Sequence, residues 1–166
     1  MSIQIRNSIS PGLMRLARQV GDKKPILEAM GLQLVSLTKR AFSDASLRPS
    51  AWPARQSGTN SLLRKSGALW QSIRITALTA NSVTVGSDRL YAAIHQLGGK
   101  IEAKPGKRLA FQIGGRKIFV KSVNIPARPF FPFKPNGEMI PAAQAKMEAV
   151  AKAKIANLLR AAESGR

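Results

Sequence analysis

The sequence is poor in the residues from which most enzyme centres are built. It has no cysteine, which excludes disulfides and thiolate-bound metals. Its single histidine, His95, and its eight acidic residues leave little for a histidine–carboxylate metal site. No serine lies in a Gly-x-Ser-x-Gly turn, and no glycine pair has the spacing of a phosphate-binding loop. We therefore expect no catalytic residues, no metal and no cofactor.

Long apolar segments are also missing. No apolar run approaches the roughly 20 residues that span a bilayer, and the N-terminus lacks the apolar core of a signal peptide. We therefore expect a soluble protein that is made in a cytoplasm and has no membrane partner.

Negative charge is scarce. The chain has 27 basic residues against 8 acidic ones, for a formal net charge of +19. Such an excess favours an anionic partner, either nucleic acid or an acidic surface, although a basic surface that only aids solubility is the alternative. No acidic residue lies between Glu102 and Glu138. The basic residues in that gap that we expect to face DNA or an acidic partner are Lys104, Lys107, Arg108, Arg116, Lys117 and Lys121.

Apolar periodicity predicts two long helices and a shorter one. A stripe with spacings of three and four residues predicts a helix from about Lys24 to Ser43; its members are Ile26, Met30, Leu34, Leu37 and Ala41. A C-terminal helix should begin after Asn136-Gly137, with Pro141 in its first turn, and fray by Ser164. A short helix is expected between Ser10 and Gly21.

Alternating segments predict strands. Ser2–Arg6 is expected to be a short edge strand. Leu69–Leu78 should form a hairpin with the strand around Val83 and Val85, and its alternation places Ile73, Ile75 and Ala77 on one face. A second hairpin should turn at Gly114-Gly115.

The register of the second hairpin can also be predicted. A two-residue turn at that point pairs Leu109 with Val120 and Phe111 with Ile118 on a mostly apolar face. The opposite face then places Arg108 across from Lys121, a pair of like charges that weakens the ladder slightly unless solvent or an anion lies over it.

A short helix is expected at the centre of the chain, where Tyr91–Gly99 reads Tyr-Ala-Ala-Ile-His-Gln-Leu-Gly-Gly. Ser87 and Asp88 could cap it, and Gly98-Gly99 should end it. The spacing of its apolar residues predicts that one face is buried; that face holds Leu90, Ala93, Ile94 and Leu97. We expect His95 to be a hydrogen-bonded structural residue rather than a base.

Two extended segments carry large aromatic residues. Trp52 lies in a loop over residues 44–61, where it is expected to pin the loop to the domain, with stacking on a ligand as the alternative. Ile125–Phe133 holds three prolines, which exclude a central strand. If this segment is extended, Phe130 and Phe131 point to opposite sides, so one should anchor the segment and the other face a neighbouring subunit.

These segments together resemble the phage virion morphogenesis family, which includes tail completion proteins of Mu-like and P2-like tailed phages. The resemblance covers roughly residues 25–160. Its most specific parts are His-Gln-Leu-Gly-Gly at 95–99 and Ile-Pro-Ala-Arg-Pro-Phe at 125–130. The sequence departs from the family pattern in the loop before Trp52 and at Phe131-Pro132. The structural motif residues in the first stretch are Tyr91, His95, Gln96, Gly98 and Gly99.

The resemblance implies a structural protein of the head–tail neck that forms a homo-oligomeric ring around the path of the DNA. Its implied partners are further copies of itself, the head connector, the tail tube or terminator proteins of the same phage, and the passing double-stranded DNA. The residues we expect at subunit or partner contacts are Arg128, Pro129, Phe130, Phe131 and Phe133. The alternatives are a monomeric basic nucleic-acid-binding protein, or a capsid assembly factor absent from the mature virion.

The patterns together predict one α+β domain over residues 1–166, long enough to bury about 70% of its unfolded surface. In it, helices pack on a small antiparallel sheet of hairpins. A long C-terminal helix and two extended arms, near 44–61 and 100–120, complete the predicted fold.

Overall fold

The computed structural model describes residues 2–4, 21–54, 63, 66–113 and 115–164. The helix predicted between Ser10 and Gly21, and most of the loop after residue 54, lie outside these residues. In chain order the elements are β1 Ser2–Gln4, α2 Lys24–Ala41, the 3-10 turn η1 Ala45–Leu47, α3 Ala68–Ser72, β2 Arg74–Leu78, β3 Val83–Gly86, α4 Ala92–Leu97, β4 Gly99–Glu102, β5 Leu109–Ile113, β6 Arg116–Val120, β7 Ser122–Ile125 and α5 Pro141–Ser164.

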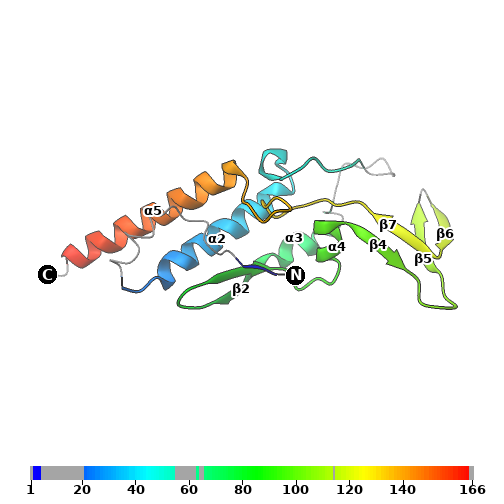
Figure 1. The fold of residues 1–166 in the computed structure, drawn as a ribbon, viewed down its shortest axis with the longest axis horizontal. Helices are drawn as coiled ribbons and strands as arrows, with labels where there is room; N and C mark the ends of the chain where they lie inside the picture. The colour runs from blue at the N-terminus through cyan, green and yellow to red at the C-terminus, as the bar shows by residue number, and fades with distance from the viewer. Residues whose placement is uncertain (1, 5–20, 55–62, 64–65, 114, 165–166) are drawn as a thin grey trace.

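The body of the molecule has three layers, with α2 between α5 and a three-stranded antiparallel sheet (Figure 1). The predicted stripe of α2 is buried along its whole length. On the side of the sheet, a Cβ on Gly31 would lie 2.6 Å from Val83 Cγ2 and 2.8 Å from Ile75 Cδ1. Glycine therefore lets the helix approach the sheet closely, and both faces of α2 contribute to the core.

The sheet has the order β1-β3-β2, which confirms the N-terminal segment as an edge strand. The predicted strand from Leu69 is wrong at its start, because residues 68–72 form α3 and the strand begins at Arg74. The pairing of β2 with β3 shifts register between Ile75 and Ala77, and Ala77 is exposed instead of following Ile75 toward the core. Strict alternation along this segment was the source of both errors.

A long arm formed by β4 to β7 extends away from the body (Figure 1). Strands β4 and β7 pair from Gly99↔Ile125 to Glu102↔Ser122, and β5 and β6 form the hairpin beyond them. The hairpin register is confirmed from Leu109↔Val120 to Ile113↔Arg116, whereas Arg108 and Lys121, predicted as a further pair, lie outside the two strands. The arm predicted near residues 100–120 therefore begins with a strand at Gly99 and is longer than expected.

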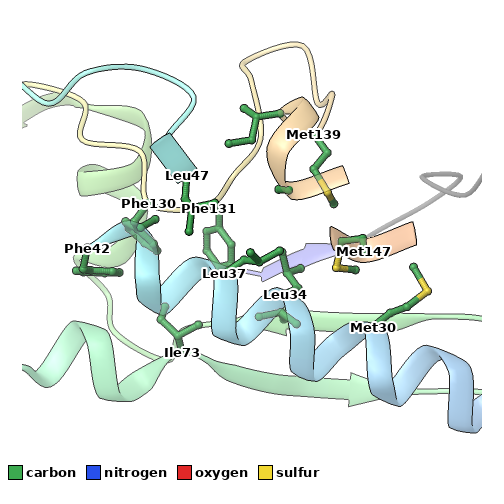
Figure 2. Packing of buried hydrophobic residues seen from close by; sticks show 14 of the residues in the cluster. Met30, Leu34, Leu37, Phe42, Leu47, Ile73, Phe130, Phe131, Met139 and Met147 are labelled. Atoms are coloured by element: carbon green, nitrogen blue, oxygen red, sulfur yellow. The ribbon is translucent and has the colours of Figure 1, made fainter. Parts of the chain in front are cut away.

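The C-terminal helix is confirmed, and its buried residues recur every four positions as Ala143, Met147, Ala151 and Ile155. Between the arm and this helix, the proline-rich segment runs back across the body. Figure 2 shows the rings of Phe130 and Phe131 side by side above α2, under Leu47 of η1. The core is thus assembled from the two long helices, the sheet and this irregular segment.

Candidate functional site

The two most specific sequence motifs meet where the arm joins the body. We call this region the motif junction and define it as Trp52–Ala54, His95–Gly99 and Ile125–Phe131. Three segments that are far apart in the sequence are joined here by hydrogen bonds between side chains and backbone.

Gln96 is the centre of the motif junction. Its side chain is buried, and Oε1 accepts hydrogen bonds from the backbone N–H of Phe130 at 2.9 Å and of Phe131 at 3.0 Å. Prolines 129 and 132 on either side have no N–H and interrupt any ladder. One amide oxygen therefore satisfies two buried donors that no strand can satisfy, which is a requirement for burying this segment.

Trp52 and Arg128 close the junction from the other side. Trp52 Nε1 donates to the carbonyl of Pro129 at 2.8 Å, and its ring is buried, which confirms that it pins its loop to the domain. The Arg128 guanidinium donates to the carbonyls of Pro53 and Ala54, both at 3.1 to 3.3 Å. The loop that carries Trp52 and the proline-rich segment are consequently fastened to each other in both directions.

The aromatic residues of the proline-rich segment belong to the core, which corrects the prediction made from the sequence. Phe130 and Phe131 are both fully buried, with ring centroids 5.1 Å apart. The expectation that one of them faces a neighbouring subunit is wrong, because the chain bends around Gln96 instead of remaining extended. Pro129 is buried as well. Arg128 and Phe133 are half-buried, so for these two a partner contact remains a prediction.

Gly98 ends α4 and starts the arm. Its φ of +69° and ψ of −176° are a combination that only glycine adopts readily. A Cβ there would lie 2.8 Å from the backbone nitrogen of Ala127. Glycine is therefore required both for the backbone conformation and for the close passage of the returning chain.

The buried face of α4 differs from the predicted one. Ala92 and Gln96, one turn apart, face the core, whereas Leu90 is 98% exposed and Leu97 is 71% exposed. The apolar residues do have helical spacing, but they do not decide which face of α4 is buried. The buried face is the one that places Gln96 Oε1 within reach of the N–H groups of Phe130 and Phe131. Ser87 likewise does not cap α4; its hydroxyl accepts from the N–H of Arg89 and bonds to Ser72.

His95 takes part in the motif junction through its backbone carbonyl, and its ring packs against an aromatic neighbour. Its carbonyl accepts from the N–H of Arg128 at 2.7 Å, and Tyr91 packs edge-on against its ring at 5.8 Å. Among the described residues its buried Nδ1 has no hydrogen-bond partner, so the prediction of a hydrogen-bonded ring is wrong for that atom. Burial, and to a smaller extent the Arg128 cation, lowers the pKa of His95. The imidazole is therefore neutral at pH 7.

The predicted partner-facing basic residues are all exposed and all lie in the arm. They occupy the connection before β5, the hairpin itself and the residue after β6. Within the described residues, none of the six forms an ion pair, and the one ion pair of the arm joins Lys100 to Glu102 at its base. The structure thus places these residues together at one end of the molecule.

A search of the described residues for groups of three or more histidine or acidic side chains able to hold a metal ion finds none. Within the same part of the chain, no helix has the length and apolarity needed to cross a membrane. The polar side chains of the motif junction contact backbone atoms, and the arrangement orders the chain rather than exposing reactive groups.

Sequence reasoning identified the motif junction residues but missed the role of Gln96. The signal that could have revealed it lies in the proline-rich segment. Two consecutive buried residues between prolines have N–H groups that require an acceptor from elsewhere. Gln96 lies one turn after Ala92 on a short helix, and its side-chain oxygen is suited to be that acceptor.

Comparison with known proteins agrees with these motifs. The model of the phage virion morphogenesis family matches residues 6–146. The chain is similar to the Mu-like prophage FluMu G protein 2 of Haemophilus influenzae, with 30% identity over 140 residues, which cover 83% of this chain and 88% of the relative. No solved structure matches the chain significantly.

Proposed function

The chain belongs to the phage virion morphogenesis family, and we propose that within this role it completes the tail and joins head to tail at the neck of the particle. The match covers most of the chain, including the whole motif junction and arm. Similarity to a Mu-like prophage protein over most of both chains supports the same assignment.

We propose that the protein acts by position and is not an enzyme. The observation that carries this proposal is the use of the motif side chains. Gln96, Trp52 and Arg128 all bond to backbone atoms of the same junction. Their polar groups fix the direction in which the arm leaves the body.

The proposed assembly is a homo-oligomeric ring around the path of the DNA. Exposed apolar side chains at the base of the arm support it, since Leu90 and the 42% exposed Tyr91 directly precede α4 and the exposed Leu97 is its last residue. A patch of this kind on one subunit and a different surface on the next form a head-to-tail contact, which closes into a ring. The arm and the half-exposed Arg128 and Phe133 then lie at contacts with neighbouring copies, the head connector, or the tail tube or terminator proteins.

Native mass spectrometry of the purified protein tests the ring. We expect a single oligomer for the wild type, and a shift toward monomer for the double variant Leu90→Ser with Leu97→Ser. The matched control is Leu32→Ser, since Leu32 is 60% exposed on α2, in the body and away from the arm. A wild type that stays monomeric at every concentration would refute the ring.

Detection of the protein in purified particles tests the location. A phage lacking the gene should accumulate separate filled heads and tails, and the finished wild-type particle should contain the protein. Its absence from finished particles would favour a capsid assembly factor that leaves before maturation.

A further inference from the structure

We infer that the β5–β6 hairpin, with Lys117 on its polar face and Arg108 and Lys121 directly beside its two strands, is a binding site for the phosphate backbone of duplex DNA, without preference for sequence. The inference deepens the proposed function: it rests on the neck assignment for where the DNA is met, whereas binding itself depends only on the arm.

The arm concentrates positive charge and holds one carboxylate. Residues 99–125 contain seven basic residues and one acidic residue, a net charge of +6 in about a sixth of a chain whose total is +19. The acidic residue, Glu102, ends β4 opposite Ser122 of β7 and pairs with Lys100 at 2.6 Å. From residue 103 to the end of β6 the arm is purely basic, and its cations are exposed. Folding brings these charges together without neutralising them, so an anionic partner gains the full attraction.

The ladder separates the hairpin into two unlike faces. Leu109, Phe111 and Ile118 lie on the half-buried apolar face. Side chains two residues apart share a face, so Lys117 and the 55% exposed Phe119 lie on the opposite face of β6. Gln112 and Ala110 lie across from these two, and Arg108 and Lys121 directly precede β5 and follow β6.

The dimensions of this face suit duplex DNA. Lys117 lies in β6 and Lys121 directly follows it, so the chain between them spans at most roughly 13 Å. A two-stranded ribbon is one of the elements that the major groove admits. The hairpin lies at the far end of the arm, beyond the β4–β7 ribbon, so a duplex can reach it without meeting the body (Figure 1).

The residue types favour DNA over an acidic protein as the partner. The cores of protein–protein interfaces are depleted in lysine, whereas four of the six exposed cations predicted to face a partner are lysines, and none of the six forms an ion pair within the described residues. Lysine and arginine supply the sequence-independent part of DNA binding through contacts to phosphates, whereas sequence is read by hydrogen bonds to base edges. The exposed cations of the arm suit the first kind of contact. Contact without sequence readout lets DNA slide past the protein, as a neck requires.

The test is binding of the full-length protein to a fluorescent mixed-sequence duplex, followed by anisotropy from about 50 to 400 mM salt. The arm variant is Lys117→Gln with Lys121→Gln. The matched control is Lys152→Gln with Arg160→Gln, which removes the same charge from exposed positions of α5. Circular dichroism confirms that both variants are folded.

We expect the plot of log affinity against log salt to be less steep by about 1.8 in the arm variant, since each phosphate contact contributes about 0.9. The control should keep the slope of the wild type. A second duplex of unrelated sequence should bind with the same affinity within about twofold, in contrast to the discrimination of a base-reading protein.

Equal loss of slope in the arm variant and the control would overturn the inference, because binding would then follow total charge and not the hairpin. A wild type that does not bind duplex at 50 mM salt would overturn it as well, and binding to a purified acidic head or tail protein would then identify the partner. A wrong neck assignment would give a different result: the protein would be absent from finished particles, while the arm variant would still show a weaker salt dependence than the wild type.

Discussion

Replacing Gln96 by methionine tests the motif junction most directly. Methionine is unbranched and close to glutamine in length, so the change removes the acceptor while creating little cavity. The N–H groups of Phe130 and Phe131, now 2.9 and 3.0 Å from Gln96 Oε1, would lose their partner in a region from which the side chain already excludes water. The expected consequence is destabilisation without a change of fold.

The magnitude follows from the two donors. A buried donor left unsatisfied costs about 1–3 kcal/mol, so the pair should lower the free energy of unfolding by about 2–6 kcal/mol. Domains are commonly stable by only about 5–15 kcal/mol. The loss is therefore a large part of the total, and it should lower the melting temperature by about 2–4 °C for each kcal/mol.

Urea unfolding followed by circular dichroism gives the measurement. The matched control is Gln144→Met on the exposed side of α5, where the side chain makes one solvent-exposed hydrogen bond to Glu148. We expect this control to change stability by less than about 0.5 kcal/mol. A Gln96→Met variant as stable as the control would show that the two N–H groups do not depend on Gln96, and the account of the junction would be wrong.

Three further predictions concern single positions. Phe131→Ala should lower the free energy of unfolding by about 3–5 kcal/mol, whereas Phe119→Ala should change it by less than about 0.5 kcal/mol; equal losses in urea titrations would contradict the burial of one ring and the exposure of the other. Gly98→Ala should lower the melting temperature more than Gly106→Ala does. Both glycines have positive φ, but only at Gly98 would a new Cβ lie against backbone atoms. The backbone conformation of Gly98 alone should cost the alanine variant about 1–3 kcal/mol of stability. The pKa of His95 is lowered in the folded state, so the unfolded chain binds the proton more tightly, and the free energy of unfolding should fall as the pH drops below the ordinary value of 6.5. His95→Gln should remove this part of the pH dependence between pH 7.5 and 5, and the variant should still assemble. A pH profile that is the same in the variant and the wild type would contradict the buried, neutral state of His95.

Sequence patterns predicted the regular parts of the fold well, because there each residue's environment depends on near neighbours. The stripe of α2 and the register of the β5–β6 hairpin are both local consequences of spacing, and both are confirmed. The same reasoning failed at Ala77, where a register shift between Ile75 and Ala77 depends on the partner strand and leaves no mark in the alternation.

The motif junction was harder to predict because its interactions are between segments far apart in the sequence. Phe130 and Phe131 were expected on opposite sides of an extended chain, yet a bend around Gln96 places both in the core. The direction of that bend depends on an acceptor more than thirty residues earlier in the chain. Likewise, the apolar spacing of Leu90 and Leu97 gave the wrong face of α4, since burial there follows the hydrogen bond of Gln96 and not the apolar residues.

The arm leaves and re-enters the body at a single pair of residues, Gly99 and Ile125, which are direct partners in a ladder. Whatever lies between two such neighbours can vary in length and composition while the core on the other side keeps its packing, and doubling the length of a flexible loop costs only about 0.6 kcal/mol. The arm can therefore be exchanged as a unit. A related chain could therefore carry a different tip on an unchanged body, and hybrids joined on either side of residues 99–125 are expected to keep the packing of the body.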